Sequence, residues 1–400
     1  MTQETLRAKL QRPYLVIPKL VEQPTWGGRY IVETKGWQTR ENLGTLKIGQ
    51  SYELFSGSNL SPLSSSEDPT FIGELTDSAH AKVPTHPDAS LHLADLIHEN
   101  PELVLGTDVV AERGNTFALL VKYTQALGNS FQVHIKDGVS DPVWKPKPES
   151  WYYFEPGLVT LGVKPGINWD AYQHTTESIQ KEMEAFSQAV TAGTLSLEDA
   201  QAKIAELLAR HDPWQFVNTL PVKKGQLIDL SSGGLHHSWE EDAVQAPLGN
   251  VLYELQAEAM DRISTFRNFD KGKIGIDGSI RSVQINEYFS AIDRSAELND
   301  PENHIVQPII ATKTDEYTLE HLLDNRHYKL DRLTLHGLDT SFGEQIARYK
   351  HLFVKNGRVA VTAGETTIAV TAGHSCFISA AATNYTVANH ADHSEILVSY

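Results

Sequence analysis

Cysteine is nearly absent from this sequence: among 400 residues, Cys376 is the only one. A single cysteine excludes an intramolecular disulfide and a cysteine-rich metal site. It is also typical of proteins kept in a reducing compartment, so we expect a cytoplasmic location. Residues 1–12 are polar and lack the apolar stretch of a secretory signal. No apolar run approaches the length that crosses a bilayer, so the sequence predicts no membrane association.

Basic residues are also in deficit. The sequence has 34 Lys and Arg against 51 Asp and Glu, which gives a formal net charge of -17. A protein with this charge repels nucleic acid and anionic lipid, so we expect neither as a partner. An anionic small molecule would have to be bound by a few local cations.

Length and patterning predict a mainly β protein with an α-helical insertion. The chain is long enough for two or three domains. Much of it alternates short apolar segments with turns, as in a sandwich or barrel, and Asn356-Gly357 has the composition of a hairpin turn. Residues 175–211 differ, because apolar residues recur there at helical spacing and Ser196 predicts the N-cap of a second helix. We therefore expect a helical hairpin inserted into β structure.

The segment that follows Asn129 predicts a strand with one apolar and one polar face. Successive side chains of a strand point to opposite faces, so Phe131 and Val133 share one face while Gln132 and His134 share the other. An amide oxygen and an imidazole side by side suit two ligands of one metal ion. The alternative is a half-buried strand whose polar face has no metal.

Two further candidate ligands lie on or beside other predicted strands, Glu149 soon afterwards and His236 much later. Two imidazoles and a carboxylate are a common set for a divalent transition metal, whereas glutamine is a rarer ligand. Two hairpins facing each other in a small barrel would bring these groups together and leave one coordination position open.

Several short segments resemble, in the same order, those of a known family. They are Trp26-Gly-Gly28, Tyr52-Glu-Leu54, Gln132-Val-His134, Lys147-Pro-Glu-Ser-Trp-Tyr152, Asn218-Thr-Leu-Pro-Val222, Gly233-Gly-Leu-His236, Glu254-Leu-Gln256 and Phe266-Arg-Asn-Phe-Asp270. The family is the type I phosphomannose isomerases of the cupin superfamily. No single segment is specific, but their shared order is.

The resemblance implies one divalent metal ion, most often zinc, ligated by Gln132, His134, Glu149 and His236. It also implies that Lys147 and Arg267 face the substrate and serve catalysis. For the architecture it implies two cupin barrels: a central metal-binding domain over residues 1–170 and 213–325, and a C-terminal domain over residues 326–400. The helical insertion, residues 171–212, interrupts the central domain.

The chain departs from the family pattern at positions that bear on proton transfer. The family's proline after the first ligand histidine is Ile135 here, and Ile263 stands where the family has an aspartate, with Asp261 nearby. Isomerisation needs a base that moves a proton between two carbons. The candidates are Lys147, Asp261 and Glu254, in that order.

Three other polar residues have two interpretations each. Lys136 could bind a substrate phosphate, or it could be an exposed lysine at a strand end. Glu254 could orient a ligand or contact the substrate, or it could be a solvated strand glutamate. His237 could carry a proton, but we expect it to point away from the metal, since it neighbours His236 in a strand.

Together these residues predict a metal-dependent aldose–ketose isomerase that interconverts mannose 6-phosphate and fructose 6-phosphate through an ene-diol intermediate. The alternatives are a cupin that binds a sugar or sugar phosphate without converting it, and an isomerase of a different sugar phosphate. The expected partner is a small-molecule sugar phosphate, and the expected assembly is a monomer or a homodimer.

Overall fold

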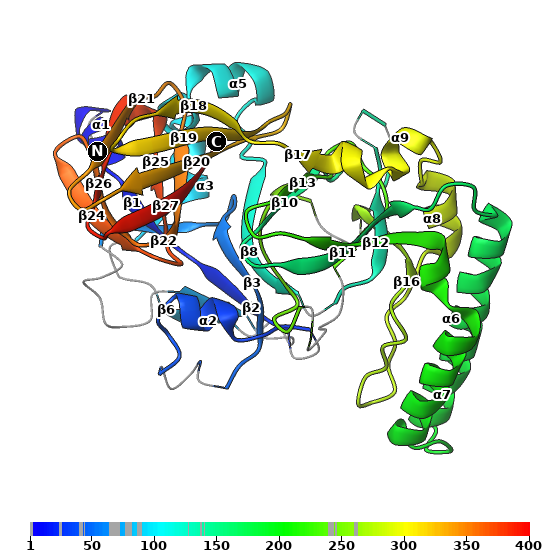
Figure 1. Cartoon of the computed structure of the whole chain (residues 1–400). Helices are drawn as coiled ribbons and strands as arrows, with labels where there is room; N and C mark the ends of the chain where they lie inside the picture. The colour runs from blue at the N-terminus through cyan, green and yellow to red at the C-terminus, as the bar shows by residue number, and fades with distance from the viewer. Residues whose placement is uncertain are drawn as a thin grey trace. The chain divides into compact units, whose positions relative to one another are not determined.

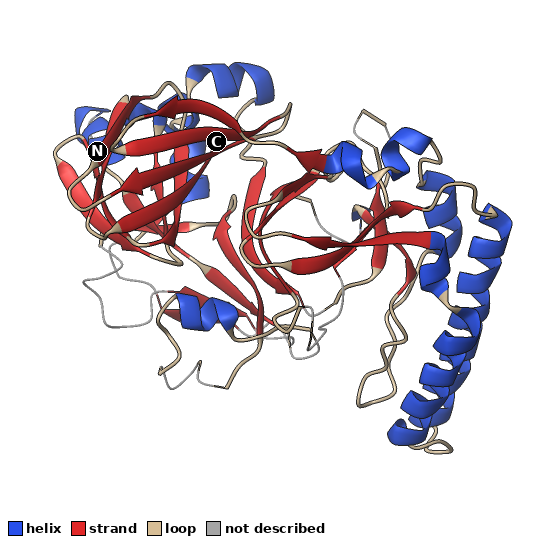
Figure 2. Cartoon of the chain, viewed as in Figure 1, coloured by secondary structure: helices blue, strands red, loops and turns tan. Residues whose placement is uncertain are grey.

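The chain divides into two compact units, each built from separated segments. The first unit comprises Met1–Gln125, Leu252–Glu258 and Val306–Tyr400, and the second comprises Ala126–Val251 and Ala259–Ile305. Strands dominate the first unit, whereas the second combines strands with long helices (Figures 1 and 2). The computed structural model describes residues 3–23, 26–39, 43, 45–63, 73–76, 82–85, 90–126, 128–136, 138–139, 141–238, 244, 246–259 and 263–400.

The second unit is built on a five-stranded antiparallel sheet with strand order β12-β11-β14-β9-β16. A shorter pair, β10 with β13, is also antiparallel. Every residue of β9, β10 and β11 is buried, so polar side chains on these strands are removed from water. The strands are β9 (Phe131–His134), β10 (Glu149–Tyr153), β11 (Gly157–Val163), β12 (Val217–Val222), β13 (Leu227–Asp229), β14 (His236–Ser238) and β16 (Thr265–Phe269).

The predicted helical hairpin is present as α6 (Trp169–Thr191) and α7 (Leu197–His211). Ser196 caps α7 as expected, since its Oγ accepts a hydrogen bond from the backbone N–H of Asp199 at 3.1 Å. However, α6 begins earlier than the predicted residue 175. Asn168 caps it there, and the buried ring of Tyr172 stacks on Phe216, which anchors the additional turns.

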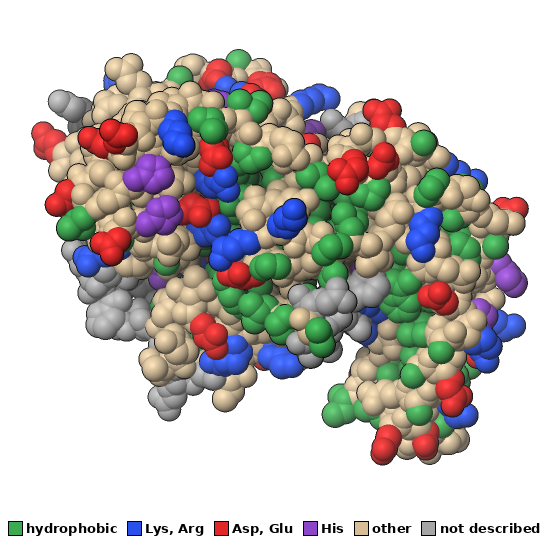
Figure 3. Space-filling view, in the orientation of Figure 1, with side chains coloured by type: hydrophobic (Ala, Val, Ile, Leu, Met, Phe, Trp, Pro, Cys, Tyr) green, Lys and Arg blue, Asp and Glu red, His purple; other side chains and the backbone are tan. Residues whose placement is uncertain are grey.

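The apolar faces of α6 and α7 join a core with residues of β9, β11 and β16. Their other faces carry charged side chains of both signs (Figure 3), among them the ion pair of Glu182 with Arg210 at 2.6 Å. Shorter helices complete the unit: η1 (Pro213–Phe216), α8 (Ile285–Ala291), α9 (Ala296–Asn299) and η3 (Pro301–His304).

The first unit contains a nine-stranded sheet of order β18-β19-β20-β27-β22-β25-β1-β4-β7 and a four-stranded sheet of order β21-β26-β23-β24. Side chains from both sheets form one core, as in a β-sandwich. The strands are β1 (Tyr14–Ile17), β4 (Asn59–Ser61), β7 (Leu91–His92), β18 (Ile309–Lys313), β19 (Tyr317–Asp324), β20 (Lys329–His336), β21 (Ser341–Gln345), β22 (Lys350–Asn356), β23 (Arg358–Ala363), β24 (Thr366–Thr371), β25 (Ser375–Ile378), β26 (Asn384–Asn389) and β27 (His393–Ser399).

The prediction of a hairpin turn at Asn356-Gly357 is wrong. The two flanking strands belong to different sheets: β22 pairs with β25 and β27, and β23 pairs with β24 and β26. Gly357 has a φ of 87°, and a Cβ there would lie 2.1 Å from Oγ of Ser394. Asn356-Gly357 therefore lies where the chain crosses from one sheet to the other, and it does not form a hairpin.

The remaining strands of the first unit form a further sheet in which β3 pairs with both β2 and β8. They are β2 (Lys19–Glu22), β3 (Ile48–Leu54), β5 (Gly73–Thr76), β6 (Lys82–Thr85) and β8 (Leu119–Ala126), and β15 (Asn250–Ala257) and β17 (Ile305–Val306) extend across the unit boundaries. The helices are α1 (Gln3–Leu10), α2 (Tyr30–Thr34), α3 (Leu93–Glu99), α4 (Pro101–Leu105), α5 (Thr107–Arg113) and η4 (Ala380–Ala382). No helix in the described part of the chain is long and apolar enough to span a membrane.

Candidate metal centre

Three predicted site residues lie in one row across the sheet of the second unit. In the antiparallel register Gln132 of β9 lies opposite His236 of β14 on one side and opposite Arg267 of β16 on the other. Residues directly opposite each other in a sheet point to the same face. Gln132, His236 and Arg267 therefore share one face of the sheet. His134 lies two residues after Gln132 in β9, so alternation places it on the same face.

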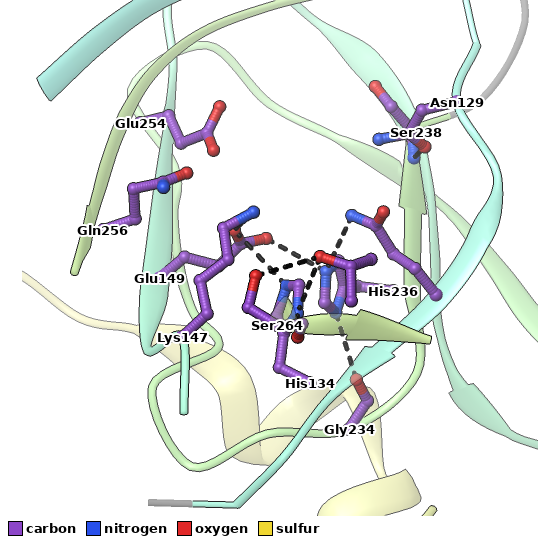
Figure 4. A network of polar contacts seen from close by, with 12 residues as sticks. Asn129, His134, Lys147, Glu149, Gly234, His236, Ser238, Glu254, Gln256 and Ser264 are labelled. Atoms are coloured by element: carbon purple, nitrogen blue, oxygen red, sulfur yellow. Dashed lines mark hydrogen bonds and ion pairs between the residues drawn. The ribbon is translucent and has the colours of Figure 1, made fainter. Parts of the chain in front are cut away.

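His134, Glu149 and His236 converge from β9, β10 and β14 (Figure 4). Nε2 of His236 lies 2.9 Å from Oε1 of Glu149, and Nε2 of His134 lies 3.5 Å from Oε2 of the same carboxylate. One ligand atom from each residue falls within 4.8 Å of the others. This is a three-residue set that could hold a metal ion, and all three residues are buried.

Backbone carbonyls orient both imidazoles. Nδ1 of His134 is 2.8 Å from the carbonyl oxygen of Ser264, and Nδ1 of His236 is 3.0 Å from that of Gly234. A carbonyl oxygen only accepts, so each Nδ1 carries a hydrogen, and in the neutral ring Nε2 then keeps its lone pair. Both lone pairs therefore face the carboxylate of Glu149, which is the tautomer that a metal-ligating histidine needs.

Gln132 is the fourth member of the predicted set. Its Nε2 lies 3.0 Å from Nε2 of His236 and donates to the lone pair there. A half-turn of the amide group would bring the acceptor oxygen Oε1 to the same place. The side chain thus lies within reach of the ligand His236, although amide nitrogen rather than oxygen faces it.

Burial and charge favour a cation at this point. Burial, with a smaller effect of the neighbouring ammonium of Lys147, lowers the pKa of His134 to about 4 against the opposing effect of Glu149, so the ring is neutral at pH 7. Burial alone would raise the pKa of Glu149, but Lys147, His134 and His236 together hold it well below its usual range. Nε2 of His134 and both oxygens of Glu149 are buried and make no hydrogen bond, so these donor atoms fit a bound metal.

Lys147 and Arg267, the two predicted catalytic residues, lie in the same unit as the ligands. Nζ of Lys147 is 3.2 Å from Oε2 of Glu149, and the lysine side chain is only 4% exposed. Arg267 is half-buried and points to the face that holds Gln132. The structure therefore brings a buried ammonium and a guanidinium to the ligand-bearing part of the fold.

The two predicted substrate-binding residues have different surroundings. Lys136 is exposed, and its Nζ forms an ion pair with Asp293 at 2.5 Å. Glu254, in the first unit, is buried: Nζ of Lys122 lies 3.1 Å from its Oε1, and Oγ1 of Thr124 donates to its Oε2 at 3.2 Å. The interpretation of Glu254 as a solvated strand residue is therefore wrong.

His237 points away from the ligands, as predicted. Its ring is buried, packs against Phe131 at a centroid distance of 4.8 Å, and places Nδ1 3.0 Å from Oγ1 of Thr160. Of the base candidates, Asp261 lies outside the described residues. Ile263 is described, and its carbonyl oxygen accepts a hydrogen bond from the backbone N–H of Lys145 at 2.7 Å.

Sequence reasoning missed the carbonyls of Ser264 and Gly234, as well as the pairing of Lys122 with Glu254. Gly233-Gly234 before His236 was a local signal, because glycines permit positive φ, and Gly234 has a φ of 106°. Ser264 carried no comparable signal. Lys122 follows apolar residues in a predicted buried strand, and a charged side chain there signals a buried partner.

Comparison with known proteins identifies the fold. No protein-family model matches the sequence, and no curated protein does. Among solved structures, mannose 6-phosphate isomerase from Bacillus subtilis matches with a TM-score of 0.64 and 15% identity over 98% of this chain and 100% of that chain. The chain has the fold of the mannose 6-phosphate isomerases.

Two further solved structures of phosphomannose isomerases also match the fold of this chain. A mutant of phosphomannose isomerase from Salmonella typhimurium matches with a TM-score of 0.63 and 12% identity over 97% of this chain and 99% of that chain. A zinc-bound mannose 6-phosphate isomerase matches with a TM-score of 0.62 and 13% identity over the same shares of the two chains. At the level of the fold, the resemblance inferred from the ordered segments is confirmed.

Proposed function

We propose that this protein is a metal-dependent aldose–ketose isomerase that interconverts mannose 6-phosphate and fructose 6-phosphate. The observation that carries the proposal is the convergence of His134, Glu149 and His236 in a chain with the fold of mannose 6-phosphate isomerases. Fold alone does not imply function, so the ligand set matters. Both imidazoles already present the lone pairs that a metal requires.

One divalent metal ion per chain, which we expect to be zinc because a structure of this fold is zinc-bound, would be held by Gln132, His134, Glu149 and His236. When bound, such an ion supplies Lewis-acid stabilisation of negative charge that develops on the sugar carbonyl oxygen as an ene-diol forms. The burial of these side chains excludes water and so strengthens each electrostatic interaction of the site.

Lys147 is our first candidate for moving the proton between the two sugar carbons. Its Nζ lies beside the ligand Glu149, so a substrate held at the metal centre would lie near it. Arg267 would bind the substrate phosphate or the developing negative charge, since a guanidinium forms bidentate hydrogen bonds with such groups. Lys136 and Glu254 remain further candidates for contact with the substrate, and Asp261 remains a second candidate base.

The finer architecture stays a prediction: two cupin barrels, with a central domain over residues 1–170 and 213–325, the helical insertion at residues 171–212 and a C-terminal domain over residues 326–400. The first compact unit contains both the N-terminal strand β1 and the C-terminal strand β25. These two strands pair, and Leu15 of β1 lies opposite Cys376 of β25. A cytoplasmic location, a role in carbohydrate metabolism and an assembly of one or two chains are likewise predictions.

The test is a coupled assay that measures fructose 6-phosphate formed from mannose 6-phosphate, with and without a chelator. We expect turnover that the chelator abolishes and that added zinc restores. The double variant His134→Ala, His236→Ala should lose both metal and activity. His393→Ala is the matched control, because this histidine is exposed and lies in the first unit.

A second measurement separates catalysis from mere binding. The proposed mechanism exchanges the C2 proton of the sugar with solvent, so deuterium from heavy water should appear at C2. Metal-loaded protein that binds the sugar phosphate but shows neither product nor exchange would refute the isomerase and leave a binding protein.

A further inference from the structure

His304 is a buried histidine outside the ligand set, and both of its ring nitrogens face carbonyl oxygens. It ends η3 and is 2% exposed. Nδ1 lies 3.0 Å from the carbonyl oxygen of Asp229, and Nε2 lies 3.0 Å from that of Leu298. A neutral imidazole has one N–H and one lone pair, so it satisfies only one of these acceptors. Both hydrogen bonds form only when both ring nitrogens carry hydrogen.

The first of these carbonyls belongs to a turn that is attached to the ligand Glu149. The backbone N–H of Leu230 donates to the carbonyl oxygen of Glu149 at 2.9 Å. Next to it, Oγ of Ser150 donates to Oδ1 of Asp229 at 2.8 Å. The start of the turn, residues 229–234, is therefore tied to β10 at the point where the carboxylate ligand projects.

The end of the same turn orients the ligand His236. The carbonyl oxygen of Gly234 accepts the hydrogen of Nδ1 of His236 at 3.0 Å. A Cβ on Gly234 would lie 3.2 Å from the carbonyl oxygen of Leu298 and 3.6 Å from Cε1 of His304. Gly234 thus lies close to the histidine and to the carbonyl of Leu298 that the histidine binds.

We propose that His304 is a positioning residue for the metal centre: with hydrogen on both ring nitrogens, it braces the turn over residues 229–234 and so holds Glu149 and His236 in place. The two hydrogen bonds of His304 join β13 at Asp229 to α9 at Leu298, and Gly234 at the end of the turn lies close to its ring. This inference rests on the proposed metal site but not on the reaction catalysed there.

His304→Phe tests the brace, because phenylalanine keeps a ring of similar size and removes both donors. Loss of an outer partner of a metal ligand typically weakens metal binding 10–100-fold, and we expect about tenfold weaker zinc binding for this indirect brace. Asn299→Ala is the matched control. Asn299 is buried in the same segment, but its side chain bonds the backbone of Val163 and Asp293 rather than the turn. The control should lose stability while keeping the zinc affinity of the parent.

Zinc affinity of His304→Phe equal to that of the parent would overturn the proposal. A loss of affinity as large in Asn299→Ala as in His304→Phe would do the same, since the effect would then be general destabilisation.

A second measurement uses the metal-free parent and needs no variant. Nitrogen-15 NMR of the imidazoles should show hydrogen on both ring nitrogens of His304, as its two carbonyl partners require. A ring nitrogen of His304 without hydrogen overturns the proposal, even if the variant does not fold. This outcome is independent of the isomerase assay, so a parent that binds zinc without turnover would sink the proposed reaction and leave the brace intact.

Discussion

Replacing Glu149 by glutamine probes the electrostatics of the metal centre. Glu149 and Lys147 have side chains that are 1% and 4% exposed, and the charged atoms lie 3.2 Å apart. Removing one partner of a buried ion pair costs about 3–5 kcal/mol, because the remaining charge stays in the interior without its counter-charge. Glutamine has nearly the volume of glutamate, so packing changes little. We expect the free energy of unfolding of the metal-free protein to fall by that amount.

The assay is urea denaturation in the presence of a chelator, applied to the parent, Glu149→Gln, Lys147→Met and the double variant. The double variant should be less destabilised than the sum of the two single variants, because it removes both charges together. Groups in direct contact usually couple by about 0.5–3 kcal/mol in such a cycle. The same four proteins, loaded with zinc, report how much of the metal affinity depends on the carboxylate.

A Glu149→Gln variant within about 0.5 kcal/mol of the parent would refute this reasoning, since that is the range of ordinary surface substitutions. It would mean that other groups compensate the ammonium of Lys147. Additive effects in the cycle would show that the two side chains do not interact, whatever their distance.

Three further outcomes follow from the same structure. Arg267→Ala removes charged hydrogen bonds worth about 1.5–3 kcal/mol, so kcat/KM should fall about ten- to a hundred-fold or more with metal content unchanged. Replacing the exposed Lys136 by alanine should have a smaller effect. Unchanged kinetics for Arg267→Ala would contradict a role of Arg267 in binding the substrate. Asp261→Asn should lower kcat much more than binding if Asp261 is the base, and should be nearly silent if Lys147 is. Burial lowers the pKa of His351 from 6.5 to about 3, so the unfolded chain takes up this proton first as pH falls. The free energy of unfolding should therefore drop between pH 6.5 and 3, by at most about 1.4 kcal/mol per pH unit from this histidine, and His351→Phe should show a shallower dependence.

Several features were predictable from the sequence because they depend on residues close together in the chain. The polar face of β9 follows from alternation within four residues, and the start of α7 follows from Ser196 and the acidic residue three positions later. The start of α6 was less predictable. Its first turns carry Tyr172, whose burial depends on Phe216 from another segment.

Tertiary structure alone decided what surrounds these side chains. His134 owes its tautomer to the carbonyl of Ser264, 130 positions away, and Glu254 is paired with Lys122, 132 positions away. No local pattern encodes such contacts, because any residue supplies a carbonyl and any lysine an ammonium. The crossing at Asn356-Gly357 shows the same limit: turn composition reports which backbone angles are allowed, whereas strand pairing depends on which sheet the next strand joins.

The sequence by itself determined a mainly β chain with a helical hairpin and a set of residue types suited to one divalent metal ion. Only the tertiary structure decided that three of these ligands meet, that both imidazoles present Nε2, and that Lys147 lies beside the carboxylate in a buried place. The reason is physical. Periodicity and capping act between neighbours in the chain, whereas a metal centre depends on the packing of strands that the chain order keeps far apart.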